Sequence, residues 1–72
     1  MATEIYPGVS VDPEVVHGKP VISGTRIPVS LVLGQLAAGV SYEELEREYG
    51  LSQEQAQAAI GYACKVRLTM EK

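Results

Sequence analysis

The segment Ser41–Ile60 reads SYEELEREYGLSQEQAQAAI, and it contains two similar helix starts separated by one glycine. Ser41 and Glu44 have the spacing of a capping box, in which the serine hydroxyl accepts a hydrogen bond from the glutamate amide and the glutamate carboxylate accepts one from the serine amide. Ser52 and Gln55 repeat this spacing. The segment therefore predicts a helix-turn-helix, with a short helix before the glycine and a longer helix after the second serine.

A further helix is predicted immediately before this segment. Pro28 suits the first position of a helix, because its fixed φ is already helical and the N–H that it lacks is not needed there. Apolar residues at helical spacing follow, before a stop at Gly39: Val29, Val32, Leu33 and Leu36. Gly50 ends the second helix, and the third is expected to direct its apolar residues inward: Ala56, Ala59, Ile60, Ala63 and Val66. Residues 28–72 thus form a predicted trihelical part.

Short strands are predicted in the first part of the chain. Val9–Val11 shows the apolar–polar alternation of a half-buried strand. The segment 21–27 reads VISGTRI and predicts a hairpin, with a two-residue turn at Ser23 and Gly24 and a return strand over its last three residues. Glycine favours this interpretation because tight hairpin turns need a positive φ. We therefore expect a short N-terminal β-hairpin arm over residues 1–27.

The length predicts one domain that associates with a second copy. A chain of 72 residues buries only about 60% of its unfolded surface, so its stability as a single chain is marginal. The apolar residues of the arm are too numerous for a free arm, and an unpaired strand edge invites association. We expect a homodimer whose interface comprises Val9, Val11, Val21, Ile22 and Ile27.

The charge argues against a self-sufficient nucleic-acid binder, which usually carries a basic excess. The net charge is −3 and the pI is near 4.9. The glutamine amides of the third helix could pair with adenine in the major groove, but no Lys or Arg lies between Gly50 and Cys64 to contact phosphates; alternatively, the three helices are only a compact small fold. We expect weak DNA binding that depends more on the basic residues of the arm than on the glutamines. The candidate DNA-binding residues are Lys19, Arg26, Gln53, Gln55 and Gln57.

The sequence offers no catalytic, metal-binding or cofactor-binding set, and we expect no enzyme activity. His17 and Cys64 are the only residues of their types, which excludes a multi-ligand metal site or a Cys-His pair of catalytic residues within one chain. We expect His17 in a solvated turn and Cys64 in the core. Asp12 and Glu14 could form an acid–base pair, but a capped turn is the favoured interpretation, because no nucleophile accompanies them.

The second helix has one acidic and one apolar set of side chains. The acidic set could be a docking face or simply a solvated face, and we favour the latter: Glu43, Glu44, Glu46 and Glu48. Glu43 and Glu44 also interact favourably with the positive end of the helix dipole, because they lie in the first turn. The apolar set, spaced by three and then four residues, predicts a core stripe: Tyr42, Leu45 and Tyr49.

The pattern of apolar residues indicates no membrane segment. The longest uncharged run, Ile27–Tyr42, is shorter and more polar than the ~20 apolar residues of a transmembrane helix. The chain shows no signal-peptide pattern, and its one cysteine cannot form an internal disulfide. We expect a cytoplasmic location.

The segment 18–39, GKPVISGTRIPVSLVLGQLAAG, followed by SYEELEREYGLS over 41–52, resembles a bacterial and archaeal family catalogued as domain of unknown function 433, a family of VapB-type antitoxins. The resemblance covers about residues 9–66. It departs from the family pattern at His17, where a second glycine is usual, and at Asp12-Pro13, where a His-Pro pair is common.

The resemblance implies a fold, a partner and a role. The fold is a mostly α, homeodomain-like helix-turn-helix bundle of three helices with a short β arm. The partner is a PIN-like nuclease encoded beside the antitoxin, and the role is to neutralise that nuclease and, as a second role, to repress the shared operon. The net negative charge of the chain is also complementary to the basic RNA-binding surface expected on such a nuclease. Two alternatives remain: a stand-alone helix-turn-helix transcription regulator, and a dimerisation module that binds neither nuclease nor DNA.

Overall fold

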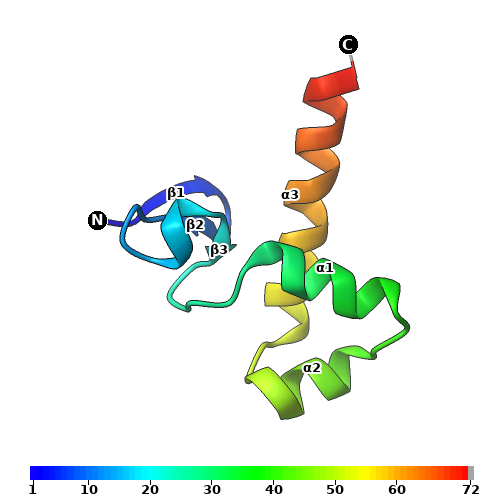
Figure 1. Ribbon diagram of the computed structural model, residues 1–72. Coiled ribbons are helices and arrows are strands. Elements are labelled where there is room, and N and C mark those ends of the chain that lie inside the picture. The colour runs from blue at the N-terminus through cyan, green and yellow to red at the C-terminus, as the bar shows by residue number, and fades with distance from the viewer. Residues whose placement is uncertain (72) are drawn as a thin grey trace.

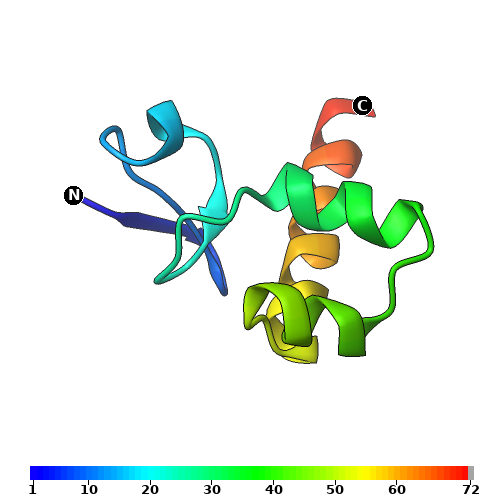
Figure 2. The ribbon, with the colours of Figure 1, turned by 60° about the horizontal axis from the view of Figure 1, so that its bottom comes forward.

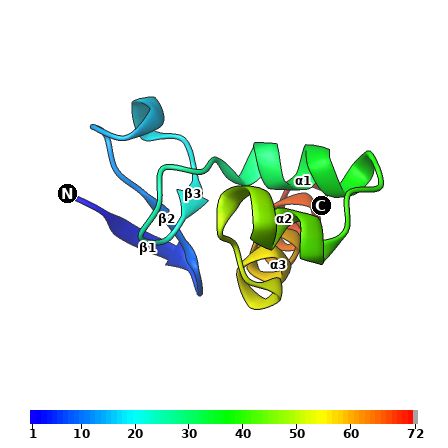
Figure 3. The same cartoon turned by 90° about the horizontal axis from the view of Figure 1, so that it is seen from below.

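The computed structural model describes residues 1–71, with side chains up to Val66. Within this part the chain is mostly helical, with a small antiparallel sheet at its N-terminus (Figure 1). The elements in chain order are β1 (Thr3–Tyr6), β2 (Val9–Val11), the 3-10 turn η1 (Val16–Gly18), β3 (Val21–Ile22), α1 (Val29–Ala37), α2 (Tyr42–Tyr49) and α3 (Gln53–Glu71). The sheet lies to one side of the three helices (Figures 2 and 3).

The sheet differs from the predicted hairpin. Its strand order is β1-β2-β3, and β3 pairs with β2 through Val9↔Ile22 and Ser10↔Val21. The segment after Gly24 forms no return strand and makes only an isolated bridge between Val21 and Pro28. The strand β1 was not predicted, because its side chains are mostly exposed and give no apolar alternation.

The turn after β3 explains why the hairpin prediction was wrong. Thr25 closes it, because its amide and its hydroxyl both donate to the Ile22 carbonyl, at 3.0 and 2.8 Å. The same hydroxyl oxygen accepts from the Ile27 amide at 3.0 Å. The Ile22 amide donates to the Ile27 carbonyl, so four residues rather than two separate the paired positions. The loop after β3 is therefore wider than a two-residue hairpin turn, and it leads directly into α1.

Replacing Gly24 with valine should destabilise the sheet and the helices together. The φ of Gly24 is +81°, and an added Cβ would meet nothing within 4 Å, so the cost comes from backbone conformation alone. A left-handed L-residue costs about 1–2 kcal/mol. Urea unfolding followed by circular dichroism measures the loss, and Gly34→Val is the matched control, since Gly34 also has open space but lies in α1 without a positive φ. Helices that persist after the sheet has melted would contradict the expectation.

The predicted helix boundaries are confirmed to within a residue. Pro28 is the N-cap of α1, so the helix begins at Val29. Ser41 and Glu44 form the complete capping box of α2, which ends at Gly50 in a left-handed conformation with a φ of +72°. The second box is also formed, because the Ser52 amide donates to the Gln55 side chain at 2.8 Å and the Gln55 amide to the Ser52 hydroxyl at 3.1 Å.

One hydrophobic core joins the sheet to the helices. Val9 and Ile22 pack with buried residues from the helices and the α2–α3 turn: Val29, Val32, Leu45, Leu51, Ala56 and Ala59. The residues expected at a dimer interface are thus largely used within the chain, because Val9, Val21 and Ile22 are buried. Val11 and Ile27 are half-buried. Strands β2 and β3 thus contribute to the same core as the helices, and the homodimer and its interface stay a prediction.

Two expected core residues lie at the surface. Tyr49, the last residue of the predicted α2 stripe, is 38% exposed, whereas Leu45 is fully buried and Tyr42 packs against the core. Cys64 is exposed on α3. The first prediction extended a helical spacing to the last residue of α2, and the second relied on the usual burial of free cysteines.

The sheet approaches α3 closely because small residues lie at the contact. A Cβ on Gly61 would lie 2.5 Å from the Tyr6 hydroxyl, and a Cβ on Gly8 would lie 2.9 Å from the Ala58 Cβ. The ring of Tyr6 meets Tyr62 edge-on at 6.1 Å, and the Lys65 ammonium lies 5.8 Å from the Tyr6 ring centroid. Gly61 therefore leaves room on α3 for the tyrosine that ends β1.

Candidate functional site

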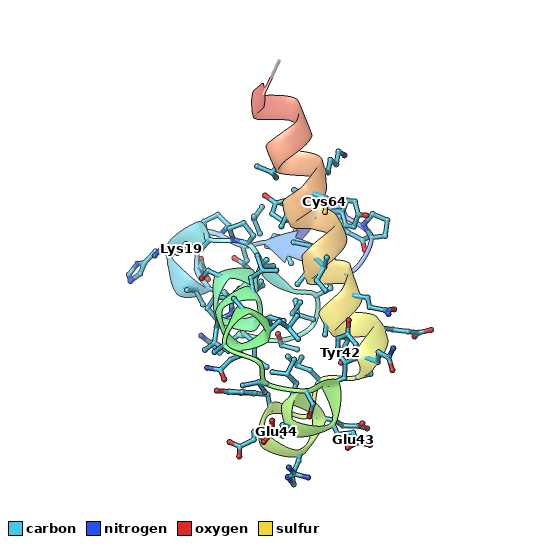
Figure 4. The ribbon with its side chains drawn as sticks, turned by 90° about the vertical axis from the view of Figure 1, so that its right-hand side faces the viewer. Lys19, Tyr42, Glu43, Glu44 and Cys64 are labelled. Carbon is cyan, nitrogen blue, oxygen red and sulfur yellow. The ribbon has the colours of Figure 1, made fainter. Side chains whose placement is uncertain are left out.

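The four glutamates of α2 form an acidic face, which we define as Glu43, Glu44, Glu46 and Glu48. All four are exposed. Glu43 and Glu44 lie on different sides of the helix (Figure 4). Among the residues with described side chains, none of the four forms an ion pair. The acidic face therefore presents a net negative charge to the surroundings, reduced by the exposed Arg47 of the same helix.

A groove opens beside this face, between α1 and α2. It has a volume of about 160 Å³ and is lined by Gln35, Val40, Glu44, Glu48 and Tyr49. Val40 is half-buried and packs against the core, while the Tyr49 side chain is partly exposed. The groove thus combines two carboxylates with an apolar wall and an aromatic ring.

The capping box of α2 fixes one side of the groove. The Ser41 amide donates to Glu44 Oε1 at 3.2 Å, and the Glu44 amide donates to the Ser41 hydroxyl at 3.1 Å. These bonds hold the Glu44 carboxylate at the helix N-terminus and leave Oε2 able to accept from another group. The exposed ring of Tyr49 and the contribution of α1 were not foreseen, because capping signals in a sequence do not show which helices lie next to each other.

The structure separates the three candidate glutamines of α3. Gln53 and Gln57 are exposed and lie one turn apart on the helix. Gln55 is half-buried, and its side-chain oxygen is engaged in the second capping box. Gln55 is therefore positioned by the helix cap and is less accessible to a base than the exposed Gln53 and Gln57.

The candidate cations of the first part of the chain lie in its loops. Lys19 follows η1, Arg26 lies in the turn after β3, and both are exposed. Arg26 also acts on Asp12, whose carboxylate accepts a hydrogen bond from the Glu14 amide at 2.9 Å. That hydrogen bond, followed by the N-terminal ammonium and Arg26, lowers the pKa of Asp12 below its ordinary value of 3.8, while desolvation opposes the shift. The favoured interpretation of Asp12 and Glu14 as a capped turn is confirmed.

The loop before Lys19 has an unusual backbone. Val16 and His17 have φ values of +50° and +55°, and Gly18 follows at +79°, so three successive residues are left-handed. A β-branched residue rarely adopts this conformation. The His17 side chain is exposed in this turn, as predicted. Nothing in the sequence around Val16 indicated the left-handed geometry.

The described residues also limit the chemistry available. Among them, no three His, Cys, Asp or Glu side chains gather closely enough to hold a metal ion. No helix in the described part of the chain is both long and apolar enough to cross a bilayer. The acidic face and its groove are the surface features for which we argue a binding role below.

Comparison with known proteins places the chain among uncharacterised relatives. A family model described as "Protein of unknown function (DUF433)" matches residues 9–63. The uncharacterized protein Rv2308 of Mycobacterium tuberculosis (strain ATCC 25618 / H37Rv) is 33% identical over 63 residues, which are 88% of this chain and 26% of that protein. The X-ray crystal structure of Rv2018 from Mycobacterium tuberculosis matches with a TM-score of 0.65 and 35% identity, over 72% of this chain and 24% of that one. The chain thus spans about a quarter of the length of these relatives.

Proposed function

We propose that this chain, which belongs to the DUF433 family, is a VapB-type antitoxin domain that binds and neutralises a PIN-like ribonuclease. The observation that carries the proposal is the acidic face of α2. A nuclease that holds RNA needs a positively charged surface, because phosphate contacts supply much of the affinity for nucleic acids. A group of exposed carboxylates with a net negative charge complements such a surface and speeds the encounter with it.

Inhibition follows from competition for one surface. Carboxylates that occupy the cationic surface of the nuclease exclude RNA phosphates from it. The chain needs no chemistry of its own for this role, in line with our proposal that it is not an enzyme. A cytoplasmic location and a homodimer belong to the same proposal.

The test uses the purified chain and the PIN-like nuclease expected beside its gene. Cleavage of a fluorescent RNA is followed while the chain is added, and the mixture is examined by size-exclusion chromatography. We expect inhibition that saturates at a fixed stoichiometry, together with co-elution of the two proteins. Undiminished cleavage at a large excess of the folded chain would contradict the proposal.

A second candidate function is DNA binding, which the arrangement of α2 and α3 favours. The two helices are joined by a three-residue turn at residues 50–52, and the exposed Gln53 and Gln57 lie at the start of α3. We propose on this basis that the helices form a homeodomain-like helix-turn-helix. Its DNA affinity is limited by the exposed Glu54 in the first turn of α3, which repels phosphates.

DNA binding by the chain alone should be weak and should depend on Lys19 and Arg26. Each phosphate contact contributes about −0.9 to the slope of log affinity against log salt, so two contacts give about −1.8 per chain. A Lys19→Ala/Arg26→Ala variant should flatten the slope on operator and random duplexes alike. The comparison variant is Gln53→Ala/Gln57→Ala, measured by fluorescence anisotropy over the same salt range. If it loses operator preference while the first variant keeps full affinity, α3 is the reading element and the expectation is wrong.

A further inference from the structure

We infer that the groove between α1 and α2 binds a single arginine side chain of a basic partner segment. The inference rests on the proposed function, because it names the chemistry that the nuclease would present to this site. The groove lies at the edge of the acidic face, and five residues line it: Gln35, Val40, Glu44, Glu48 and Tyr49.

The two carboxylates provide the charge that an arginine needs. Glu44 and Glu48 lie one helical turn apart on the same side of α2 and both line the groove. Like charges at this spacing destabilise a helix, and no described cation pairs with either carboxylate. A guanidinium between them would remove the repulsion and could donate in parallel to carboxylate oxygens, as arginine does in its strongest pairs.

One of the carboxylates is already positioned. The Ser41 amide holds Glu44 Oε1 at 3.2 Å, so binding would immobilise fewer rotamers than a pair of unrestrained glutamates requires. The carboxylate of Glu48 is the adjustable second partner. Neutralising Glu48 should therefore weaken arginine binding without disturbing the cap of α2.

The rest of the groove matches the stem and the plane of an arginine. Val40 supplies an apolar wall for the methylene groups, and the Tyr49 ring, 38% exposed as a residue, offers a face on which a guanidinium can stack. The Gln35 side chain adds an amide oxygen that can accept from one of the five guanidinium N–H groups. Lysine, a compact charge without a plane, uses fewer of these features.

The size and composition of the groove argue against other ligands. Its volume of about 160 Å³ is below the ~300–1,000 Å³ of small-molecule pockets, and it suits one side chain. Anions are repelled by the two glutamates. A divalent metal would need further ligands, and no three candidate side chains gather among the described residues.

The test titrates the isotopically labelled full chain with two capped tripeptides, Gly-Arg-Gly and Gly-citrulline-Gly. Citrulline has nearly the shape of arginine but carries no charge. We expect saturable amide shifts at Val40, Glu48 and Tyr49 with the arginine peptide, in the millimolar range, and at least fivefold weaker binding of the citrulline peptide. The Glu48→Gln substitution should lower the affinity for the arginine peptide by about fivefold or more, since it removes a charge-assisted hydrogen-bonded pair.

The control variant is Glu46→Gln, which removes the same charge from an exposed position of the same helix outside the groove. It should change the affinity by less than about twofold, as expected for an exposed charge. Equal binding of both peptides, shifts without saturation, or equal losses in the two variants would overturn the inference. The peptide titration contains no nuclease, so its result is independent of the inhibition assay. If the chain binds the arginine peptide but does not inhibit the nuclease, the proposed function is refuted and the arginine site is not.

Discussion

Replacing Ile22 with alanine should lower the free energy of unfolding of the whole domain by about 2–5 kcal/mol, the usual range for a large aliphatic side chain removed from a core. Ile22 is 1% exposed and packs in the same cluster as Val32 of α1 and Leu45 of α2. A domain of this size has little stability in reserve. The helices should therefore melt with the sheet, and a large part of the population should be unfolded at 37 °C.

Thermal and urea unfolding followed by circular dichroism at helical wavelengths measures this effect. Ile5→Ala is the matched control, because Ile5 lies in β1 and is 36% exposed, so the same atoms are removed from a surface position. Its effect should stay within about 1 kcal/mol, as for most surface substitutions. Helices that keep their stability in the Ile22 variant would show that residues 1–27 fold apart from the helices after all.

Reversing the charge of Glu46 should lower the association rate constant with the nuclease roughly tenfold at low salt, because opposite charges steer the encounter of two proteins. Glu46 is an exposed member of the acidic face and does not line the groove. The dissociation rate should change little. Glu48→Gln should mainly raise the dissociation rate, because Glu48 contacts the inserted side chain in the proposed complex.

Stopped-flow or surface-immobilised kinetics over a range of salt separates these effects. Glu14→Lys is the control for Glu46→Lys, since it makes the same change in net charge at an exposed position of the segment between β2 and η1, which lies away from α2 (Figure 1). It should leave both rate constants nearly unchanged. Equal effects of the two reversals would mean that net charge, not the acidic face, controls association.

The local signals of the sequence predicted the helices well. Each capping box consists of side chains and amides within four residues, so Ser41 with Glu44 and Ser52 with Gln55 determine their helix starts without help from the rest of the fold. Gly50 likewise ends α2 through its own backbone conformation. Boundaries that depend on such short-range bonds can be predicted from one sequence.

The pairing of the strands depends on contacts that a single sequence does not display. The VISGTRI segment has the composition of a hairpin, but Val21 and Ile22 pair with β2 instead, and the Thr25 hydroxyl closes a wider turn. The sequence predicts a second subunit for these apolar residues because they are too numerous for a free arm. In the structure Ile22 lies in the same core cluster as residues of the helices, and Ile27 packs against it.

The candidate site was predicted in part. The four glutamates of α2 were visible in the sequence, where both a docking face and a solvated face were considered. The groove depends on the position of α1 beside α2, and thus on Gln35 and Val40, which local patterns cannot place. The glutamines of α3 were treated as equivalent, although the Ser52 cap already engages Gln55.

Isothermal titration of the chain into the PIN-like nuclease at two ionic strengths tests the central claim, recognition of a basic partner by the acidic face, most directly. Measurements at about 50 mM and about 500 mM salt span the range over which exposed charges become screened. We predict saturable binding at low salt and a dissociation constant at least tenfold higher at high salt. Absence of binding at low salt, or an affinity that does not change with salt, would contradict the account.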